Sequence, residues 1–272
     1  MPSDPRLIFS RKGAPIATPP GVVRESHPRH PAAAIIRFTR EHVRNALGPQ
    51  DLLQAARHLE DCQHDPAVSV VFLTGTGVAF TSGFDLKVLN ALPSEERPLA
   101  LDSATELMTR IVTTPKVVIA AVNGHSAGLG NHIAICSDLC IARRGAAFHF
   151  TGSAKGIPSM QYGALLLPMV IGMKRAKALL LRGGRLDAAQ AEALGLCNSV
   201  VDETCWDAQI DALAEEFSGK HLGTLAQNKY QLNQLAFQLL GALKLSSLAG
   251  AGQMSAASPL VTGGLKDLRN VE

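Results

Sequence analysis

The sequence predicts an α/β fold with a largely parallel sheet, and three observations lead to this class. Short apolar runs typical of buried strands occur at 32–38, 68–74 and 117–121. A segment with helical character follows each run, at 49–63, 95–112 and 129–136. The second and third runs also end in glycine-rich turns. Strands that alternate with helices in this way pair in parallel through right-handed crossovers.

The same alternation continues toward the C-terminus. Short strands are predicted at 139–142 and 147–150, and helices are predicted to begin near Tyr162, Arg175 and Ala188. The tail predicts two more helices, at 208–217 and 222–243. In the second of these, apolar residues recur at helical spacing, as at Leu225, Leu232, Leu235 and Leu239.

The chain shows no obvious internal linker, so we expect one core with extensions. The expected parts are an irregular N-terminal arm over 1–31, a core over 32–202 and a helical extension over 203–272. Basic residues outnumber acidic ones in the first thirty positions, which raises a transit sequence as an alternative. Frequent prolines interrupt any amphipathic helix there and favour a loosely packed arm.

Composition is that of a compact globular protein. The 272 residues are 46% hydrophobic and 18% charged, which allows a large buried core. A net charge of +3, without basic stretches interleaved with aromatic residues, argues against a nucleic-acid partner. No apolar stretch approaches membrane-spanning length, so no membrane partner is expected.

Five cysteines are present, at positions 62, 136, 140, 197 and 205. Cys136 and Cys140 stand four apart, but no second ligand pair supports a metal site, so none is expected. An odd number of cysteines favours a reducing compartment. We therefore expect a cytoplasmic protein, with mitochondrial or peroxisomal placement as the alternatives.

Two turns carry the candidate chemistry. Gly75 to Lys87 follows one buried strand, and Asn123 to His132 follows another. Glycines leave room for backbone N–H groups to face outward. The helix expected from Leu129 directs its N-terminus at the second turn, and a helix start favours negative charge. Two such donor sites are able to hold one carbonyl oxygen from two sides.

With these turns the chain resembles the crotonase (enoyl-CoA hydratase/isomerase) superfamily. The resemblance runs from about Ala32 onward and also includes 44–47, 148–158 and 184–201. It implies a crotonase-like spiral of ββα units, which periodicity alone does not reveal. It also implies an acyl-CoA substrate whose thioester oxygen lies between the backbone amides of Phe84 and Leu129. Coenzyme A enters only as part of that thioester, with no tightly bound cofactor.

Further implications concern binding and assembly. The stretch of the family that contacts adenine maps onto His42, Val43 and Arg44, with Ser82 nearby, and Phe84 joins them as a coenzyme A contact. C-terminal helices in the family cover the acyl pocket and build trimers, often paired into hexamers. Lys229 matches a lysine found on such a helix, where a coenzyme A phosphate contact and a plain surface charge are the alternatives.

The chain departs from the two-glutamate hydratases of this family. The two glutamate positions fall on His132 and Gly152, so their hydration mechanism does not carry over. His132 is the best candidate for moving a proton, because imidazole titrates near neutrality and His132 lies one helical turn after Leu129. Other candidates are Ser153, Lys155 and Tyr162. His149, His125 and Asp85 are expected to have structural roles.

Several reactions stay open. Thr151-Gly152 and Tyr162-Gly163 are similar to the naphthoyl-CoA synthase branch, but its active-site Ser, Asp and Gln map onto Ile157, Ser159 and Phe150. The histidine near the first glutamate position is similar to the carbon–carbon bond hydrolases of the superfamily. An acyl-CoA-binding protein with weak catalysis is the third possibility. The resemblance favours an enzyme of the hydratase/isomerase family, because both glycine-rich turns are retained.

Overall fold

The fold contains two β-sheets. The computed structural model describes residues 21–93, 96–155, 159 and 161–237. A six-stranded sheet has the strand order β1-β2-β3-β5-β7-β10, and a four-stranded sheet has the order β4-β6-β8-β9. The strands are β1 (Val22–Ser26), β2 (Ala33–Phe38), β3 (Val70–Gly75), β4 (Ala79–Thr81), β5 (Val117–Val122), β6 (His125–Ala127), β7 (Leu139–Arg143), β8 (Ala147–Phe150), β9 (Gly184–Asp187) and β10 (Ser199–Val201).

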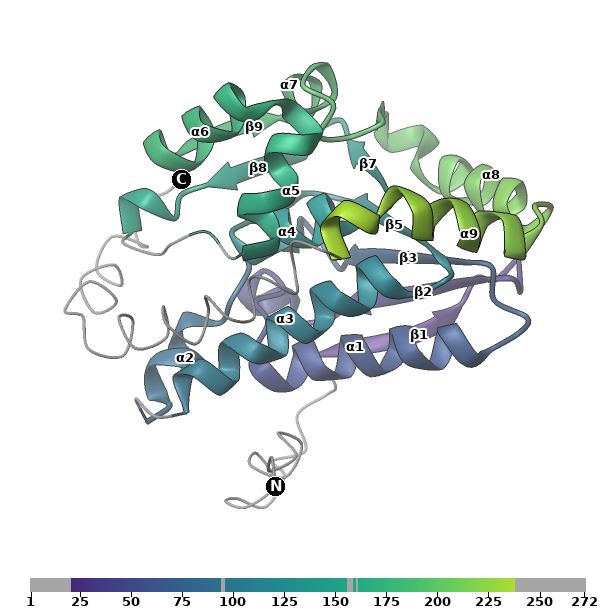
Figure 1. Cartoon of the computed structure of the whole chain (residues 1–272), viewed down its shortest axis with the longest axis horizontal. Helices are drawn as coiled ribbons and strands as arrows, with labels where there is room; N and C mark the ends of the chain where they lie inside the picture. Colours follow the sequence, from purple (N-terminus) through teal and green to yellow (C-terminus); the bar gives the residue numbers. More distant parts are fainter. Residues whose placement is uncertain (1–20, 94–95, 156–158, 160, 238–272) are drawn as a thin grey trace.

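Along the chain, helices lie between single strands or between pairs of strands that follow one another directly (Figure 1). They are α1 (Pro49–His64), α2 (Leu86–Ala91), α3 (Arg97–Thr113), α4 (Leu129–Cys136), α5 (Gln161–Ile171), α6 (Met173–Arg182), α7 (Ala188–Ala193), α8 (Trp206–Ser218) and α9 (Leu222–Leu232). Short 3-10 turns lie at Glu41–Val43, Ser153–Lys155 and Glu203–Cys205.

Each turn of the spiral adds one strand to each sheet. β3 and β4, then β5 and β6, then β7 and β8 follow one another directly, and the first member of each pair enters the larger sheet. β2, β3, β5 and β7 pair in parallel, as the alternation predicts. β4, β6 and β8 also pair in parallel. In the smaller sheet the sequence predicted only β8, at 147–150. It missed β9 as well as β4 and β6, which have only three residues each.

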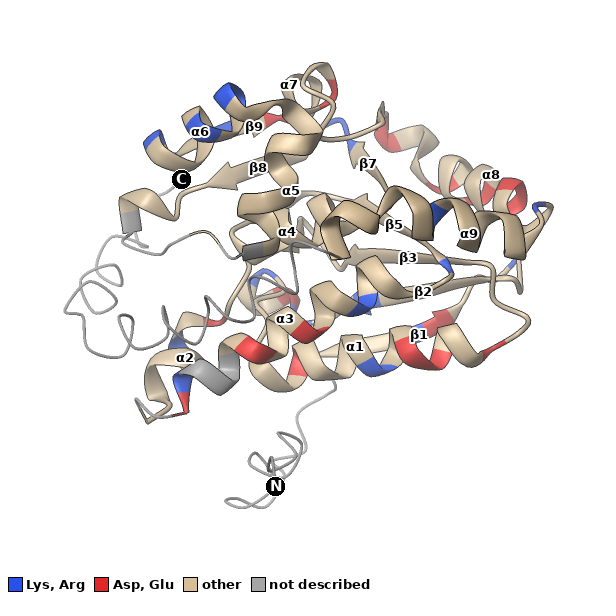
Figure 2. Cartoon of the chain, viewed as in Figure 1, with Lys and Arg blue, Asp and Glu red and all other residues tan. Residues whose placement is uncertain are grey.

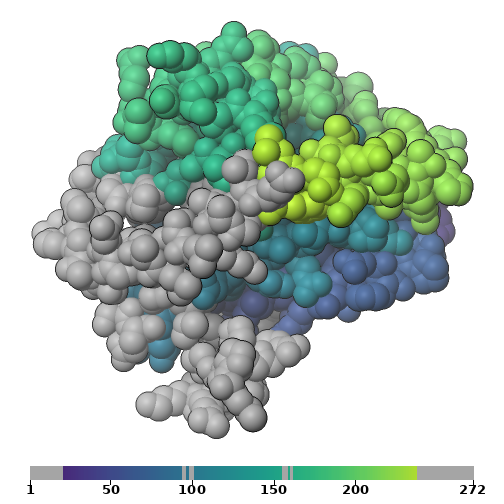
Figure 3. Space-filling model, viewed as in Figure 1, coloured from purple at the N-terminus to yellow at the C-terminus, as the bar shows by residue number. Residues whose placement is uncertain are grey.

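Both faces of the large sheet are covered. Along β2, Ala34, Ile36 and Phe38 belong to the core shared with α1 and α3, whereas Ala33 and Ile35 pack with the core that includes Trp206 and Phe217 of α8. Strands buried on both faces read as continuous apolar runs, which explains why β3 and β5 stand out in the sequence. Figure 3 shows α8 and α9 (green to yellow) on one flank of the molecule.

Two sequence expectations need correction here. The segment expected as an irregular arm contains β1, whose residues pair antiparallel with β2 from Val22↔Phe38 to Ser26↔Ala34. Edge pairing with a buried strand supplies the backbone partners that such an arm would lack. The helix expected over 222–243 appears as α9, which ends at Leu232. Residues 1–20 and 238–272, including Leu239, lie outside the described part.

Surface charge is divided between helices. Basic side chains line α6 and acidic side chains line α8 (Figure 2). The small positive net charge of the chain is therefore the balance of separate basic and acidic surfaces.

Candidate active site

The two glycine-rich turns meet in space. Gly83 has a φ of 90°, and a Cβ at this position would lie 2.6 Å from the carbonyl oxygen of Ala127 and 3.0 Å from the backbone nitrogen of Leu129. Both distances are shorter than side chains tolerate against backbone atoms. Glycine is therefore required here for its conformation and for the close approach. Segments more than forty residues apart in sequence are in contact at this point.

The backbone around Phe84 is held from one side. Leu47 N–H donates to Gly83 O at 2.8 Å, and Asp85 N–H donates to Leu47 O at 2.9 Å, which forms a parallel bridge between Leu47 and Phe84. In such a bridge the peptide groups flanking Phe84 face Leu47, so the N–H of Phe84 itself faces away. Among the described residues this N–H has no hydrogen-bond partner.

Leu129 is the first residue of α4, so its N–H is one of the donors that the helix leaves unpaired. Gly128, with a φ of 52°, turns the chain into this helix. The carbonyl oxygen of His149 fixes the turn, because it accepts from Gly128 N–H at 3.4 Å and from Asn131 Nδ2 at 2.9 Å. The positive end of the helix is thereby held against the Gly83 turn.

Two buried asparagines brace the first turn. Asn45 Nδ2 donates to the carbonyl oxygens of Thr76 at 2.9 Å and Ala79 at 2.8 Å. Asn123 Oδ1 accepts from Gly75 N–H at 3.0 Å, and its Nδ2 donates to Gly77 O at 2.9 Å. Side-chain amides that both donate and accept replace the ladder bonds that an irregular loop lacks. The turn is therefore a fixed piece of backbone.

Asp85 has the structural role that the resemblance implied. Its carboxylate accepts from the N–H groups of Lys87 and Val88, both at 3.2 Å, and so caps α2. Its other oxygen lies 2.9 Å from Arg40 Nη2. The cap and the ion pair hold the chain directly after Phe84 in place.

His132 is buried one helical turn after Leu129, and its side chain is 6% exposed. Burial lowers the pKa of His132 to about 4, so the ring is neutral at neutral pH. Nε2 lies 3.2 Å from Ser159 Oγ, and Nδ1 has no partner among the described residues. At Gly163, in the first turn of α5, a Cβ would lie 2.6 Å from Cδ2 of this ring. The ring is therefore packed flat against the α5 backbone.

The other proton-moving candidates have different surroundings. Tyr162 is buried and shares a 2.5 Å hydrogen bond with Thr109 of α3, and burial raises the pKa of Tyr162 to about 12. The hydroxyl of Tyr162 therefore links α3 to α5 by a hydrogen bond. With a raised pKa it is also a poor acid near neutrality. Ser153 is exposed, and the side chain of Lys155 lies outside the described residues.

The two remaining histidines of interest face each other across the smaller sheet. His125 Nδ1 and His149 Nε2 lie 3.3 Å apart, with His125 on β6 and His149 on β8. This pairing agrees with the structural roles expected of both. Gly152, onto which the resemblance maps the second glutamate, follows β8 and is partly exposed.

The residues expected to contact adenine lie together beside the first turn. Ser82 N–H donates to Arg44 O at 2.9 Å, and Ser82 Oγ donates to Val43 O at 3.3 Å. His42 belongs to the same 3-10 turn as Val43, and His42, Arg44 and Ser82 are all exposed. Arg44 has a φ of 53° and Asn45 one of 56°, so this corner is sharply turned next to Phe84.

Sequence reasoning missed the contact between Ser159 and His132. Ser159 follows the 3-10 turn after β8, twenty-seven positions beyond His132 in sequence, and no spacing rule links the two. It also missed Asn45 and Asn123 as braces. An asparagine next to a glycine-rich turn was the available signal, since its amide is suited to backbone groups that lack partners.

Lys229 is not a surface charge, which corrects the sequence expectation. It is buried, and its Nζ donates to Ile111 O at 2.9 Å, Lys116 O at 2.9 Å and Asp138 Oδ2 at 2.7 Å. These partners use all three ammonium protons, so a coenzyme A phosphate contact is not available to it as folded. Burial lowers the pKa of Lys229, and the Asp138 carboxylate opposes that shift.

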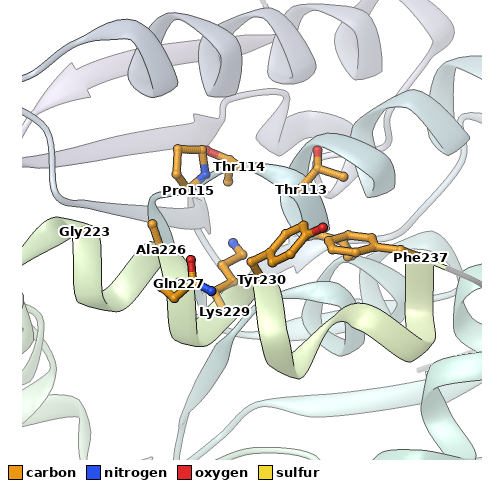
Figure 4. Close-up of a pocket in the computed structure, with 10 residues that line it drawn as sticks. Thr113, Thr114, Pro115, Gly223, Ala226, Gln227, Lys229, Tyr230 and Phe237 are labelled. Atoms are coloured by element: carbon orange, nitrogen blue, oxygen red, sulfur yellow. The ribbon is translucent and has the colours of Figure 1, made fainter.

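A cavity of about 270 Å³ lies beside Lys229 (Figure 4). Its lining comes from the end of α3, from Pro115, from α9, including Tyr230, and from Phe237 beyond the end of α9. Lys229 reaches Asp138, which follows the C-terminal end of α4, whereas the contact between the two turns is at the N-terminal end of that helix. The cavity and the turns therefore belong to different parts of the molecule.

One group of possible metal ligands occurs among the described residues: His27, His30 and Asp211. His27 Nδ1 accepts from the N–H groups of Arg29 and His30, both at 3.3 Å, so the ring proton resides on Nε2. Nε2 lies 3.3 Å from Asp211, which also pairs with Arg29. Both ring nitrogens are thus engaged, and the group ties the β1–β2 connection to α8 without an ion.

No helix in the part of the chain that the structure describes is long and apolar enough to cross a membrane.

The chain is similar to several known proteins. The family model described as enoyl-CoA hydratase/isomerase matches residues 29–240. A putative enoyl-CoA hydratase of Thermus thermophilus is 33% identical over 80% of this chain and 87% of its own. A 1,2-epoxyphenylacetyl-CoA isomerase of Escherichia coli is 34% identical over 72% and 78%. A 4-chlorobenzoyl coenzyme A dehalogenase of Arthrobacter is 30% identical over 73% and 74%.

Solved structures show the same fold. An enoyl-CoA hydratase from Mycobacterium avium subsp. paratuberculosis has a TM-score of 0.78 at 25% identity and covers 92% of this chain and 98% of its own. An enoyl-CoA hydratase/isomerase from Mycobacterium paratuberculosis has a TM-score of 0.82 at 24% identity and covers 92% and 99%. The spiral of ββα units expected from the resemblance is confirmed.

Proposed function

Because the chain belongs to the enoyl-CoA hydratase/isomerase family, we propose that it is an acyl-CoA enzyme that holds the thioester oxygen between the N–H groups of Phe84 and Leu129. The observation that carries the proposal is the close approach at Gly83, where a Cβ would lie only 3.0 Å from the Leu129 nitrogen. Phe84 is the next residue, and its N–H faces away from Leu47. In this proposal the contact at Gly83 brings the two unpaired N–H groups, one from each turn, next to each other.

Such a pair stabilises charge that develops during the reaction. When the thioester becomes an enolate or a tetrahedral intermediate, its oxygen gains negative charge, and fixed N–H donors need no reorganisation to meet it. Loss of one such donor costs about 3–4 kcal/mol of transition-state stabilisation in enzymes that use the same device. The Asn45 and Asn123 braces support the proposal, because a clamp of this kind requires rigid turns.

Proton transfer falls to His132 in this proposal, since the positions of both family glutamates hold His132 and Gly152. A neutral imidazole is a proton acceptor, and burial keeps this ring neutral down to pH values near its lowered pKa of about 4. His132 lies one helical turn from Leu129, so acceptor and clamp share the short helix α4.

Coenzyme A enters as part of the substrate thioester. We place its adenine end at the exposed corner of His42, Val43 and Arg44 with Ser82, because this corner adjoins Phe84. We also propose a homotrimer, alone or paired into a hexamer. Large apolar side chains exposed on α5 and α6, namely Met169, Val170 and Met173, support an assembled state.

Exchange of α-protons tests the proposal without knowledge of the final product. Saturated acyl-CoA thioesters of several chain lengths, and phenylacetyl-CoA, are incubated with the protein in D₂O and followed by mass spectrometry. We expect the protein to introduce deuterium at the α-carbon of at least one thioester. His132→Ala should reduce the exchange by at least about 100-fold, because general base catalysis contributes that much. No exchange with any thioester, or exchange that is unchanged in His132→Ala, would contradict the assignment.

A carbon–carbon bond hydrolase is the second candidate, and the single neutral histidine beside the clamp favours it. Cleavage of a β-dicarbonyl compound needs an enolate acceptor site and one general base, and both groups are present in the proposed arrangement. Release of a carboxylic acid and a shortened acyl-CoA from a β-ketoacyl thioester would favour this reaction over simple enolisation. A naphthoyl-CoA-synthase-like enzyme, or an acyl-CoA-binding protein with weak catalysis, would release no such fragments.

A further inference from the structure

We propose that Ser159 and His132 act as a nucleophile and its base, and that the protein hydrolyses acyl-CoA thioesters through an acyl-serine intermediate. The inference rests on the proposed function, because the thioester oxygen has to lie at the amides of Phe84 and Leu129. It adds an activity to that site and a catalytic role for Ser159, to which the sequence analysis assigned none.

The distance between the two side chains carries the inference. Ser159 Oγ lies 3.2 Å from His132 Nε2, which is the hydrogen-bond separation of an activated hydroxyl nucleophile and its base. Ser159 is half-buried, so it is neither sealed in the core nor fully in water. His132 is buried on α4, whose first residue supplies one of the two proposed oxyanion donors. His132 therefore links the two groups, because its ring lies beside Ser159 Oγ and its backbone is one helical turn after Leu129.

In many hydrolases an acidic side chain orients the histidine that activates the serine. Here the packing around the His132 ring takes the place of that side chain. When Ser159 Oγ–H donates to Nε2, the ring proton is on Nδ1, and this buried atom has no partner among the described residues. A buried donor without a partner costs about 1–3 kcal/mol, which indicates a functional constraint on the ring. Orientation comes instead from packing, since a Cβ at Gly163 would lie 2.7 Å from Nε2. The Tyr162–Thr109 hydrogen bond, at 2.5 Å, anchors α5 where Gly163 covers the ring.

The reaction balances without a further reagent. Ser159 Oγ attacks the thioester carbonyl carbon as its proton moves to His132 Nε2, and the amides of Phe84 and Leu129 receive the oxyanion. The C–S bond then breaks, and the coenzyme A thiolate takes the proton from His132. Water next attacks the acyl-serine with His132 as base, and the ester C–O bond breaks. The products are a carboxylic acid, coenzyme A and free Ser159.

The base is available over a wide pH range. Because burial lowers the pKa of His132 to about 4, Nε2 is unprotonated and available as the base throughout the neutral range. Hydrolysis should therefore lose rate on the acid side only near that pKa, well below the ordinary value for histidine.

The test uses the full chain with benzoyl-, cinnamoyl- and butyryl-CoA. Free coenzyme A and the carboxylic acid are separated by chromatography, and the acylated protein is sought by mass spectrometry after acid quench and digestion. We expect release of coenzyme A above the buffer rate and an acyl group on Ser159 itself. Ser159→Ala should lower the release at least about 100-fold and abolish the adduct. Ser218→Ala, at an exposed serine on α8, is the matched control and should leave both unchanged.

Three outcomes overturn the inference. If no thioester is hydrolysed while α-proton exchange persists, Ser159 is not a nucleophile and the proposed function stands. If Ser159→Ala retains hydrolysis at the wild-type rate, the acyl-serine step is wrong even though the thioester is cleaved. Absence of both hydrolysis and exchange would contradict the inference together with the proposed function on which it rests.

Discussion

His132 shows how one side chain can be placed for chemistry at a cost in stability. The ring is buried without an acidic neighbour, and desolvation alone lowers its pKa to about 4. A histidine that served only packing would be replaced at no loss by an apolar residue of similar size. Its position next to Leu129 and Ser159 agrees with the proposed proton transfer.

The free energy of unfolding should therefore depend on pH through this residue. Between an ordinary pKa of about 6.5 and the lowered value, the unfolded chain takes up a proton that the folded chain does not. Stability is thus fully present above pH 6.5 and falls as the pH decreases toward 4. At pH 4.5 the loss attributable to His132 should be about 2–3 kcal/mol relative to pH 7.5.

Urea unfolding of the wild type and of His132→Leu at both pH values measures this loss. The variant lacks the titrating group, so its stability should decrease less on acidification by that amount. Equal decreases in the two proteins would show that His132 is accessible to protons in the folded state.

At the scale of elements, α9 is attached by a buried ion pair. Lys229 of α9 binds Asp138, which follows α4. It also donates to the carbonyl oxygens of Ile111 on α3 and of Lys116 just before β5. Asp138 Oδ2 also accepts from Val118 N–H at 2.8 Å. Removal of the ammonium group would leave the Asp138 carboxylate and the two carbonyl oxygens without their hydrogen-bond donor. Water does not readily take the place of the donor at this buried position.

Lys229→Met should therefore destabilise the protein by about 3–5 kcal/mol. The matched control is Lys220→Met, whose ammonium group pairs with Glu216 on the surface and which should change stability by about 0.5 kcal/mol or less. Urea titration followed by circular dichroism measures both. Similar effects of the two substitutions would mean that the Lys229 pair does not hold α9.

The longer strands and helices were predictable from the sequence, whereas the shortest strands were not. β3, β5 and α1 were predictable because strands buried on both faces read as apolar runs and a long helix is amphipathic. β4 and β6 were not, because three residues carry no periodicity and their pairing depends on distant strands. The proposed site was predictable at Phe84 and Leu129 through glycine-rich turns. Ser159 was not, since only the fold brings it to His132.

At the scale of the whole molecule, the fold and the family point to acyl-CoA chemistry. The resemblance maps the two glutamate positions of the family onto His132 and Gly152, and this mapping argues against ordinary hydration. Hydration needs one group to activate water and another to deliver a proton to carbon. One neutral histidine with a lowered pKa is poorly suited to both tasks.

Crotonyl-CoA hydration should therefore be at least about 100-fold slower than in a family member that carries both glutamates, which is the loss expected for one missing acid–base group. Loss of the enoyl absorbance under identical conditions, with such an enzyme as the reference, gives the comparison. A rate equal to the reference would mean that other residues occupy the catalytic positions.

The central claim is that the N–H groups of Phe84 and Leu129 converge on one thioester oxygen. The infrared stretching frequency of a ¹³C-labelled thioester carbonyl in bound cinnamoyl-CoA measures this convergence directly. Gly83→Ala is the informative variant, because its Cβ would meet the Leu129 nitrogen at 3.0 Å. Gly172→Ala is the matched control, since Gly172 also has a positive φ, of 85°, but has open space around it.

Binding to the wild type and to Gly172→Ala should shift the carbonyl band to lower frequency than in water, as expected for an oxygen held by two donors. Gly83→Ala should still fold and bind the nucleotide end, yet lose most of that shift. A wild-type carbonyl frequency equal to that in water, with cinnamoyl-CoA bound, would contradict the account.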